Sequence, residues 1–246
     1  MAAQAEVIDN RITARQRERV FYTGMAVLFL LTVFAGFART YFLRPVFQTQ
    51  PLQTILHLHG LLFTSWIVLM LVQTGLIAAK RTRTHMRLGI AGGVLASLMI
   101  IVGSLTAIIR AKVVVVPPAS GSPLMFLTIP LGDMLMFAIL IGAALYFRRQ
   151  VDTHKRLMLI ATITLMPAAV ARLPFDFFQQ GGPLIFFGIS DLFLVPLLLF
   201  DLLTRGRPHK ATILGGALLV ISHPLRLLIG ATHAWLVVAT WLTQWT

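Results

Sequence analysis

The sequence predicts an all-α fold, a polytopic integral membrane bundle of about seven transmembrane helices. Of the 246 residues, 57% are hydrophobic and only 12% are charged, whereas soluble domains are usually about a quarter charged. The mean hydropathy is +0.84. The apolar residues are gathered into seven runs, each long enough to cross a hydrocarbon layer that needs about 20 residues of helix. These observations exclude a soluble globular core.

The expected transmembrane domain covers residues 20–230. Helix is the expected conformation because backbone amides in lipid need partners within their own segment. The alternating strands of a membrane barrel, about ten residues each, are absent from the sequence. In chain order, the spans are expected at residues 20–43, 53–79, 88–110, 124–147, 155–172, 184–204 and 211–230.

Two shorter segments flank this domain. Residues 1–19 are polar and basic, and we expect them in the cytoplasm as an interfacial helix or a frayed tail. Residues 231–246 contain three tryptophans but are too short to cross a bilayer, so we expect an aromatic helix on the outer surface. The alternative is an unbroken last helix that kinks at Pro224. The Phe-rich residues 173–188 are expected to form a lid or a segment that dips into lipid.

The distribution of cations predicts the orientation. Fifteen of the 21 lysines and arginines flank span ends on the same side as the N-terminus, and six lie on the other side. The positive-inside rule therefore places the N-terminus in the cytoplasm and, after seven spans, the C-terminus outside. Anionic lipid headgroups at the cytoplasmic face then explain the net charge of +13 without nucleic acid as a partner. No cleavable signal peptide is evident, and a bacterial inner membrane is the expected location.

A short motif recurs at the cytoplasmic start of three spans. The first two copies have Thr-His followed by basic and apolar residues, and the third is Pro-His-Lys; they lie at residues 84–88, 153–157 and 208–210. This recurrence predicts a repeat of three helical hairpins, to which the first helix is added.

Ionisable side chains within lipid are costly, so they mark candidate functional positions. Five are expected in the outer half of the bundle, with Arg172 and Arg226 at the rim: His57, His59, Asp133, Asp191 and His223. His59 and His223 lie at matching depths on different helices, as the ligands of one haem iron or of a His/Asp metal site must. The aspartates are expected as further ligands or as groups that orient the imidazoles. The ordinary alternative is ion pairing of Asp191 with Arg226 and of Asp133 with Arg172.

Three other histidines begin helices at the cytoplasmic side: His85, His154 and His209. Neighbouring lysines and arginines favour the neutral form of an imidazole, which is the form that binds metals. The alternative interpretation is that these residues start helices at the membrane interface, with Thr84 or Asp152 as caps.

Three segments carry a resemblance to known families: LHLHGLLFTSW at 56–66, RTHMRLG at 83–89 and THKRLML at 153–159. They are similar to segments of small bacterial inner-membrane proteins, of cytochrome b561-like proteins and of membrane factors associated with oxidase assembly. The resemblance implies a bundle that holds haem b, with His59 and His223 as the outer ligands and His85 and His154 as the inner ones. In the b561-like group the ligands lie well inside the helices, whereas His85 and His154 are expected at helix ends.

Absent residue types narrow the chemistry. The sequence has no cysteine, which excludes disulfides, thiolate metal sites, iron–sulfur clusters and thioether-linked haem. A retinal protein needs a lysine inside the last span, where the nearest lysine is Lys210 at its edge. The sequence contains no P-loop and no GxSxG motif.

Three functions remain open, and the number of histidines favours the first. It is a haem- or metal-binding redox protein that transfers electrons or serves a terminal oxidase or its assembly. The second is a zinc-dependent membrane hydrolase for lipid-like substrates, similar to the ceramidase and adipoQ-receptor group, although the last span lacks that group's HxxxH pair. The third is a non-enzymatic accessory subunit or carrier in a larger membrane complex. A transporter is also compatible with the hairpins, with Pro167 and Pro196 as candidate helix breaks.

Overall fold

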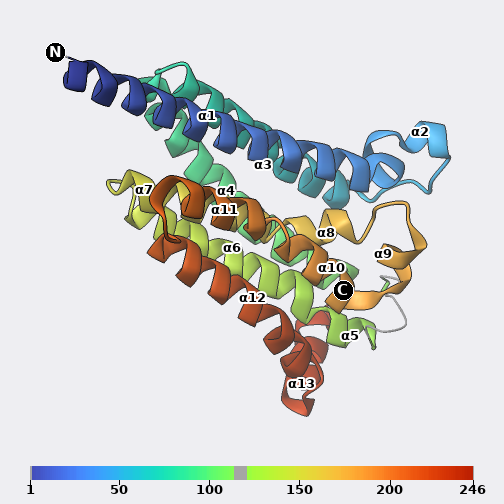
Figure 1. The fold of residues 1–246 in the computed structure, drawn as a ribbon. Coiled ribbons are helices and arrows are strands. Elements are labelled where there is room, and N and C mark those ends of the chain that lie inside the picture. The colour runs from blue at the N-terminus through green and yellow to red at the C-terminus, as the bar shows by residue number, and fades with distance from the viewer. Residues whose placement is uncertain (1, 114–120, 246) are drawn as a thin grey trace.

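A computed structural model describes residues 2–113 and 121–245, without the side chains of residues 2–14 and 179. Every regular element in these two ranges is helical (Figure 1). In chain order they are α1 (Ala2–Phe37), the π-helical turn η1 (Ala38–Phe42), α2 (Arg44–Phe47), α3 (Thr54–Ala78), α4 (Thr82–Arg110), α5 (Pro123–Phe126), α6 (Thr128–Tyr146), α7 (Val151–Ile163), α8 (Met166–Val170), α9 (Asp176–Gln180), α10 (Gly182–Asp191), α11 (Leu194–Arg205), α12 (Lys210–Gly230) and α13 (His233–Thr243).

Six helical stretches among the described residues are long and apolar enough to cross a membrane. They are Arg15–Phe42, Thr54–Ala78, Thr82–Arg110, Pro123–Tyr146, Gly182–Arg205 and Lys210–Gly230. Each overlaps one of the expected spans. The prediction of an all-α membrane bundle is therefore confirmed for these six.

The remaining expected span, residues 155–172, folds differently. It consists of α7 and α8, which are separated by a turn at Thr164 and Leu165. The segment begins with several charged residues, and Pro167 lies in the first turn of α8, where its missing N–H interrupts the helical hydrogen bonds. Most side chains of α7 and α8 from Arg156 onward are buried. This segment is thus shielded by other helices, whereas the six long helices face lipid over much of their length.

Three helical hairpins, α3–α4, α6–α7 and α11–α12, have their connections at the end of the bundle where α1 begins (Figure 1). We call this end the inner end, because the connections and the start of α1 carry the fifteen cations noted above. The first helix packs along α3 and α8, and α12 packs along α6 and α7. The interrupted segment α7–α8 therefore lies between the two groups of long helices.

The core of the bundle centres on α6 and α7. Phe137, Leu159 and Ile160 have 0% of their surface exposed. Trp66 of α3 packs edge-on against Phe137, with ring centroids 5.1 Å apart, and its Nε1–H donates to Thr162 Oγ1 at 3.2 Å. This indole therefore ties α3 to α6 through a ring contact and to α7 through a hydrogen bond.

Large apolar side chains are also exposed along the outside of the long helices. Ile90 of α4 is 75% exposed, Leu203 of α11 is 84% exposed and Leu228 of α12 is 68% exposed. Monomeric soluble proteins rarely expose contiguous apolar surface on this scale. Contact with lipid acyl chains accounts for it.

The N-terminal residues continue directly into the first long helix, whereas the C-terminal residues form a separate short helix. The basic residues 2–19 form the first turns of α1 and not a separate element. At the other end, α12 continues through Pro224 to Gly230, and α13 begins after a turn. Trp235 of α13 donates its Nε1–H to the carbonyl of Leu124 at 2.8 Å. The last helix is therefore separate from α12 and is held against α5.

Gly36 allows α1 to approach α8 closely. A Cβ at Gly36 would lie 2.2 Å from the carbonyl oxygen of Ala169, so we expect Gly36→Ala to lower the free energy of unfolding by about 1–3 kcal/mol. Gly24→Ala on the same helix is the control, because a Cβ there meets nothing within 4 Å. Thermal unfolding in detergent micelles measures both variants. Equal midpoints for the two would contradict the prediction.

Candidate functional site

His223 of α12 is buried in the outer half of the bundle, with 4% of its side chain exposed. Its Nδ1 lies 3.2 Å from Asp191 Oδ2, and its ring stacks on Phe187, with centroids 4.0 Å apart and planes 6° from parallel. We assign the proton to Nδ1, which then donates to the carboxylate and leaves a lone pair on Nε2. That Nε2 is buried and has no hydrogen-bond partner within the described structure.

Asp191 owes its position to the end of a helix. It is the last residue of α10, and a turn at Leu192 and Phe193 separates α10 from α11. Its Oδ1 is buried and, like His223 Nε2, finds no partner in the described ranges. The carboxylate therefore holds the imidazole through one oxygen and keeps acceptor capacity on the other.

Arg226 lies less than one turn beyond His223 on α12 and reaches α6. One of its terminal nitrogens, Nη1, donates to Asp133 Oδ1, and Nη2 donates to Ser222 Oγ at 2.9 Å. The guanidinium also lies over the Phe187 ring, 5.6 Å from its centroid. Gly132 makes room for it, because a Cβ there would lie 2.4 Å from Arg226 Cδ. We call these two pairs, His223 with Asp191 and Arg226 with Asp133, the outer cluster.

The ion pairs that the sequence suggested as the alternative, Asp191 with Arg226 and Asp133 with Arg172, therefore have the wrong partners. Arg226 pairs with Asp133 and not with Asp191, because α12 presents it towards α6. Arg172 does not pair with Asp133. It donates to the carbonyl of Ala168 at 2.7 Å and lies over the ring of Phe37 at 4.9 Å.

His57 and His59 lie on α3, which packs against α1 and α4, whereas α12 packs against α6 and α7. His59 stacks on Phe63 at 4.1 Å between centroids, and its Nδ1 is buried without a partner in the described structure. His57 is exposed, and its carbonyl accepts a hydrogen bond from Tyr41 at 3.3 Å.

No group of three or more His, Asp or Glu side chains that could hold a metal ion occurs among the described residues. The structure thus joins Asp191 to His223 but does not gather the five expected metal ligands at one centre. A haem needs only two histidines, so this result does not address His59 and His223 as its ligands.

The inner histidines have different hydrogen bonds. His154 Nδ1 lies 2.8 Å from the carbonyl of Ala144, which makes Nδ1 the donor and leaves Nε2 with a lone pair. His85 Nδ1 instead accepts a hydrogen bond from the side-chain amide N–H of Gln73 at 2.7 Å. In this orientation of the amide, the Gln73 side-chain oxygen also accepts from the Gly89 N–H at 3.1 Å. The neutral form of His85 then carries its proton on Nε2. This tautomer does not suit the inner haem ligand that the family resemblance implies.

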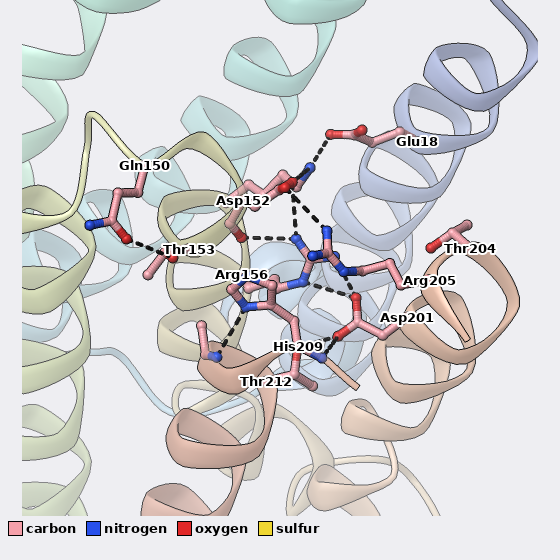
Figure 2. Close-up of polar contacts among 12 residues, drawn as sticks. Glu18, Gln150, Asp152, Thr153, Arg156, Asp201, Thr204, Arg205, His209 and Thr212 are labelled. Atoms are coloured by element: carbon pink, nitrogen blue, oxygen red, sulfur yellow. Dashed lines mark hydrogen bonds and ion pairs between the residues drawn. The ribbon is translucent and has the colours of Figure 1, made fainter. Parts of the chain in front are cut away.

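A second polar cluster, which the sequence did not predict, joins α1, α7, α11 and α12 at the inner end (Figure 2). We call it the inner network. At its centre, Arg156 of α7 donates to the fully buried Asp201 of α11 through Nη2 and, at 2.9 Å, through Nε. Asp201 also accepts from the His209 N–H at 2.9 Å and from Thr212 Oγ1 at 2.6 Å. The carboxylate thus ties α7, α11 and the start of α12 together.

Asp152 forms the exposed half of the inner network. It contacts Lys155 at 2.5 Å and Arg205 at 3.2 Å, and Lys155 also pairs with Glu18 of α1. Burial acts to raise the pKa of the Asp152 carboxyl, but the hydrogen bond from Lys155 and the charges of the neighbouring cations outweigh burial and lower it to about 2. Asp152 therefore stays ionised and bridges α7 to α11.

His209 caps the N-terminus of α12. Its Nδ1 accepts from the Ala211 N–H at 3.1 Å. Burial lowers the pKa of His209, and the positive charges of Arg156 and Arg205 lower it further. The imidazole is therefore held neutral, which the cap requires. A capping role matches the interpretation of this histidine as a helix start.

The sequence contained one usable sign of the inner network. Asp201 is a lone carboxylate inside the apolar run 184–204, and such a group needs a partner in lipid. Its partner, Arg156, could not be chosen among fifteen inner cations without knowing which helices touch.

Comparison with protein-family models, with curated proteins and with solved structures finds no match for this chain. The functional interpretation therefore depends on the two clusters described above.

Removal of Arg156 would leave Asp201 buried without a counter-charge. We expect Arg156→Met to lower the free energy of unfolding by about 3–5 kcal/mol. Arg149→Met removes an exposed cation and is expected to change it by no more than about 0.5 kcal/mol. Chemical unfolding in detergent measures both variants. The double variant Arg156→Met with Asp201→Leu should regain part of the loss, and no recovery would contradict the ion-pair explanation.

The pKa of Asp152 makes stability depend on acidity. Because the pKa falls from 3.8 in the unfolded chain to about 2 in the folded protein, the contribution is present above pH 3.8 and is lost as the pH falls towards 2. Half of the side chain is exposed, so we expect at most about 1 kcal/mol. Thermal midpoints from pH 2 to 6 should fall less steeply in Asp152→Asn than in the unchanged protein. Parallel curves for Asp152→Asn and the unchanged protein would refute the lowered pKa of Asp152. Asp176→Asn, which changes an exposed aspartate, is the control.

Proposed function

We propose that this chain is a multi-pass membrane redox protein that binds haem b in the outer half of its bundle, with His223 as an axial ligand. The observation that carries the proposal is the state of the two ring nitrogens. Nδ1 is fixed by Asp191, and Nε2 is buried and lacks a partner in the described structure. This division is usual for a metal-ligating histidine, because the carboxylate orients the ring while the other nitrogen keeps its lone pair.

His59 is the second proposed ligand. Unlike His223, it has no acceptor that fixes its Nδ1, and this atom is itself buried and unpartnered within the described ranges. A buried polar atom without a partner is unfavourable unless something else satisfies it. Haem would supply one-electron transfer at this position. Phe187 would hold the His223 ring in place by stacking, and the Arg226–Asp133 pair would add no net charge beside it.

A second candidate function is that of a carrier, and the helix interruptions favour it. The turn before α8 is followed by Pro167, and the turn between α10 and α11 is followed by Pro196. These are the two positions where the sequence predicts breaks. The outer halves α8 and α10 also pack against each other. Interrupted helices that meet beside buried ionisable groups are typical of secondary transporters.

A zinc-dependent hydrolase has less support. The reaction needs about three protein ligands to hold the metal and one open position for water. The residues that the structure describes contain no such group. The proposal would regain support if the colourless purified protein held stoichiometric zinc.

We further propose the topology that the cation distribution predicts. The N-terminus lies in the cytoplasm, α7–α8 crosses the membrane in addition to the six long stretches, as the fifth of seven crossings in chain order, and the C-terminus lies outside. Support for this additional crossing comes from the inner network, since α7 starts beside the end of α11, while α8 packs against α10 in the outer half. The inner cations would then face anionic headgroups of a bacterial inner membrane.

An optical spectrum of the purified protein tests the haem proposal. We expect a Soret band that is lost in His223→Ala and in His59→Ala. His233→Ala, at the exposed start of α13, should keep the band. Asp191→Leu should weaken haem affinity by about 10–100-fold, because the imidazole loses its orienting acceptor. A protein that stays colourless after incubation with haem would refute the proposal and favour the carrier.

A further inference from the structure

A cavity lies at the outer end of the bundle, directly beyond the outer cluster. Its volume is about 360 Å³, within the range of sites for small molecules. The side chains that line it belong to α5, α6, α10 and α12, and they include Met125, Phe126, Ile129, Pro183, Leu184 and Leu227.

The cavity and the outer cluster share three helix faces. Leu227 follows His223 by four residues on α12, and Ile129 precedes Asp133 by four residues on α6. On α10, Pro183 precedes by four residues Phe187, whose ring stacks on His223 of the outer cluster. Residues four apart lie on one face of a helix, about one turn or 5.4 Å apart. The cavity therefore lies about one turn outward from the proposed haem ligand.

The lining indicates a neutral, lipid-soluble occupant. None of the residues that line the cavity carries a charge. Leu184 is 68% exposed at its edge, in the helical stretch Gly182–Arg205, which is long and apolar enough to cross a membrane. A molecule dissolved in the bilayer could thus enter from the side, whereas a charged solute would lose its hydration without gaining a counter-charge.

The start of α10 adds a hydrogen-bond donor to this apolar space. Pro183 and Leu184, in the first turn of α10, both line the cavity. Pro183 has no N–H, and the Gly181 N–H already donates to the carbonyl of Phe177 at 3.1 Å, so the donor that this turn offers is the N–H of Leu184. The first N–H groups of a helix have no partner within it and carry partial positive charge. They suit a carbonyl oxygen, so the occupant that fits best combines an apolar ring with a neutral acceptor.

We propose that this cavity binds the ring of a membrane-dissolved quinone. The walls of Phe126, Ile129 and Leu227 would hold the ring, and the start of α10 would donate to a ring carbonyl. The further claim that this quinone exchanges electrons with the chain rests on the proposed redox function. Its binding alone does not require haem.

Photolabelling of the full chain in nanodiscs tests the proposal. A short-chain azidobenzoquinone is the probe, and mass spectrometry locates the attached label. We expect label on the peptides that contain residues 121–129, 181–184 and 227. An excess of ubiquinone-1 should suppress it, and the same excess of decylbenzene, which lacks a carbonyl, should not. Equal suppression by decylbenzene would overturn the assignment to a quinone.

Two substitutions fill the cavity, and one matched substitution does not. Leu227→Trp and Ile129→Phe should each reduce labelling by at least about tenfold, which corresponds to about 1.4 kcal/mol. Leu228→Trp adds the same bulk to the neighbouring residue, which is 68% exposed, and should leave labelling unchanged. Only variants that elute as the unchanged protein does in size-exclusion chromatography are compared. Labelling that persists in both cavity variants would overturn the proposal.

The outcome is separable from that of the haem proposal. Site-specific labelling of a colourless protein would support the quinone site and refute the redox function. A protein with a Soret band but with label spread over lipid-facing residues would support the haem proposal and refute the quinone site.

Discussion

The ion pair between Arg156 and Asp201 is the interaction on which the arrangement of the bundle depends. Both side chains are almost fully buried, and a buried charge without its partner is strongly unfavourable. This requirement fixes how deep and in which rotation α7 meets α11. The same carboxylate accepts from His209 and Thr212, so it also fixes the start of α12. The position of His223, further along that helix, therefore depends on a contact at the opposite end of the bundle.

The two polar clusters differ in how completely their hydrogen bonds are satisfied. In the inner network, Asp201 of α11 accepts four hydrogen bonds, two from α7 and two from the start of α12. In the outer cluster, Asp191 Oδ1, His223 Nε2 and Arg226 Nε are buried without partners in the described structure. A saturated network stabilises one arrangement of helices. Buried atoms that lack partners are costly and mark the place where a ligand would be bound most favourably.

Particular residues show how far the sequence could lead. Hydropathy located the six long helices, and it marked Asp133, Asp191 and His223 as candidate groups in the outer half. Pro167 and Pro196 indicated the interruptions next to α8 and α11. The sequence missed the inner network, although Asp201 stood alone in an apolar run. It also paired Arg226 with the wrong aspartate, because Asp133 and Asp191 are both within its range of depth and differ only in the helix that carries them.

The sequence by itself determined that the chain is a helical membrane bundle, which segments form its six long helices, and which end of the bundle carries the cations. These are properties of single segments, since apolar length and local charge act wherever a helix is placed. The tertiary structure alone decided which aspartate meets which cation, which histidine nitrogen is left free, and that α7–α8 is buried inside the bundle. Each residue turns a helix by about 100°, so the partner of a side chain depends on the rotation and neighbours of its helix, which no single segment encodes.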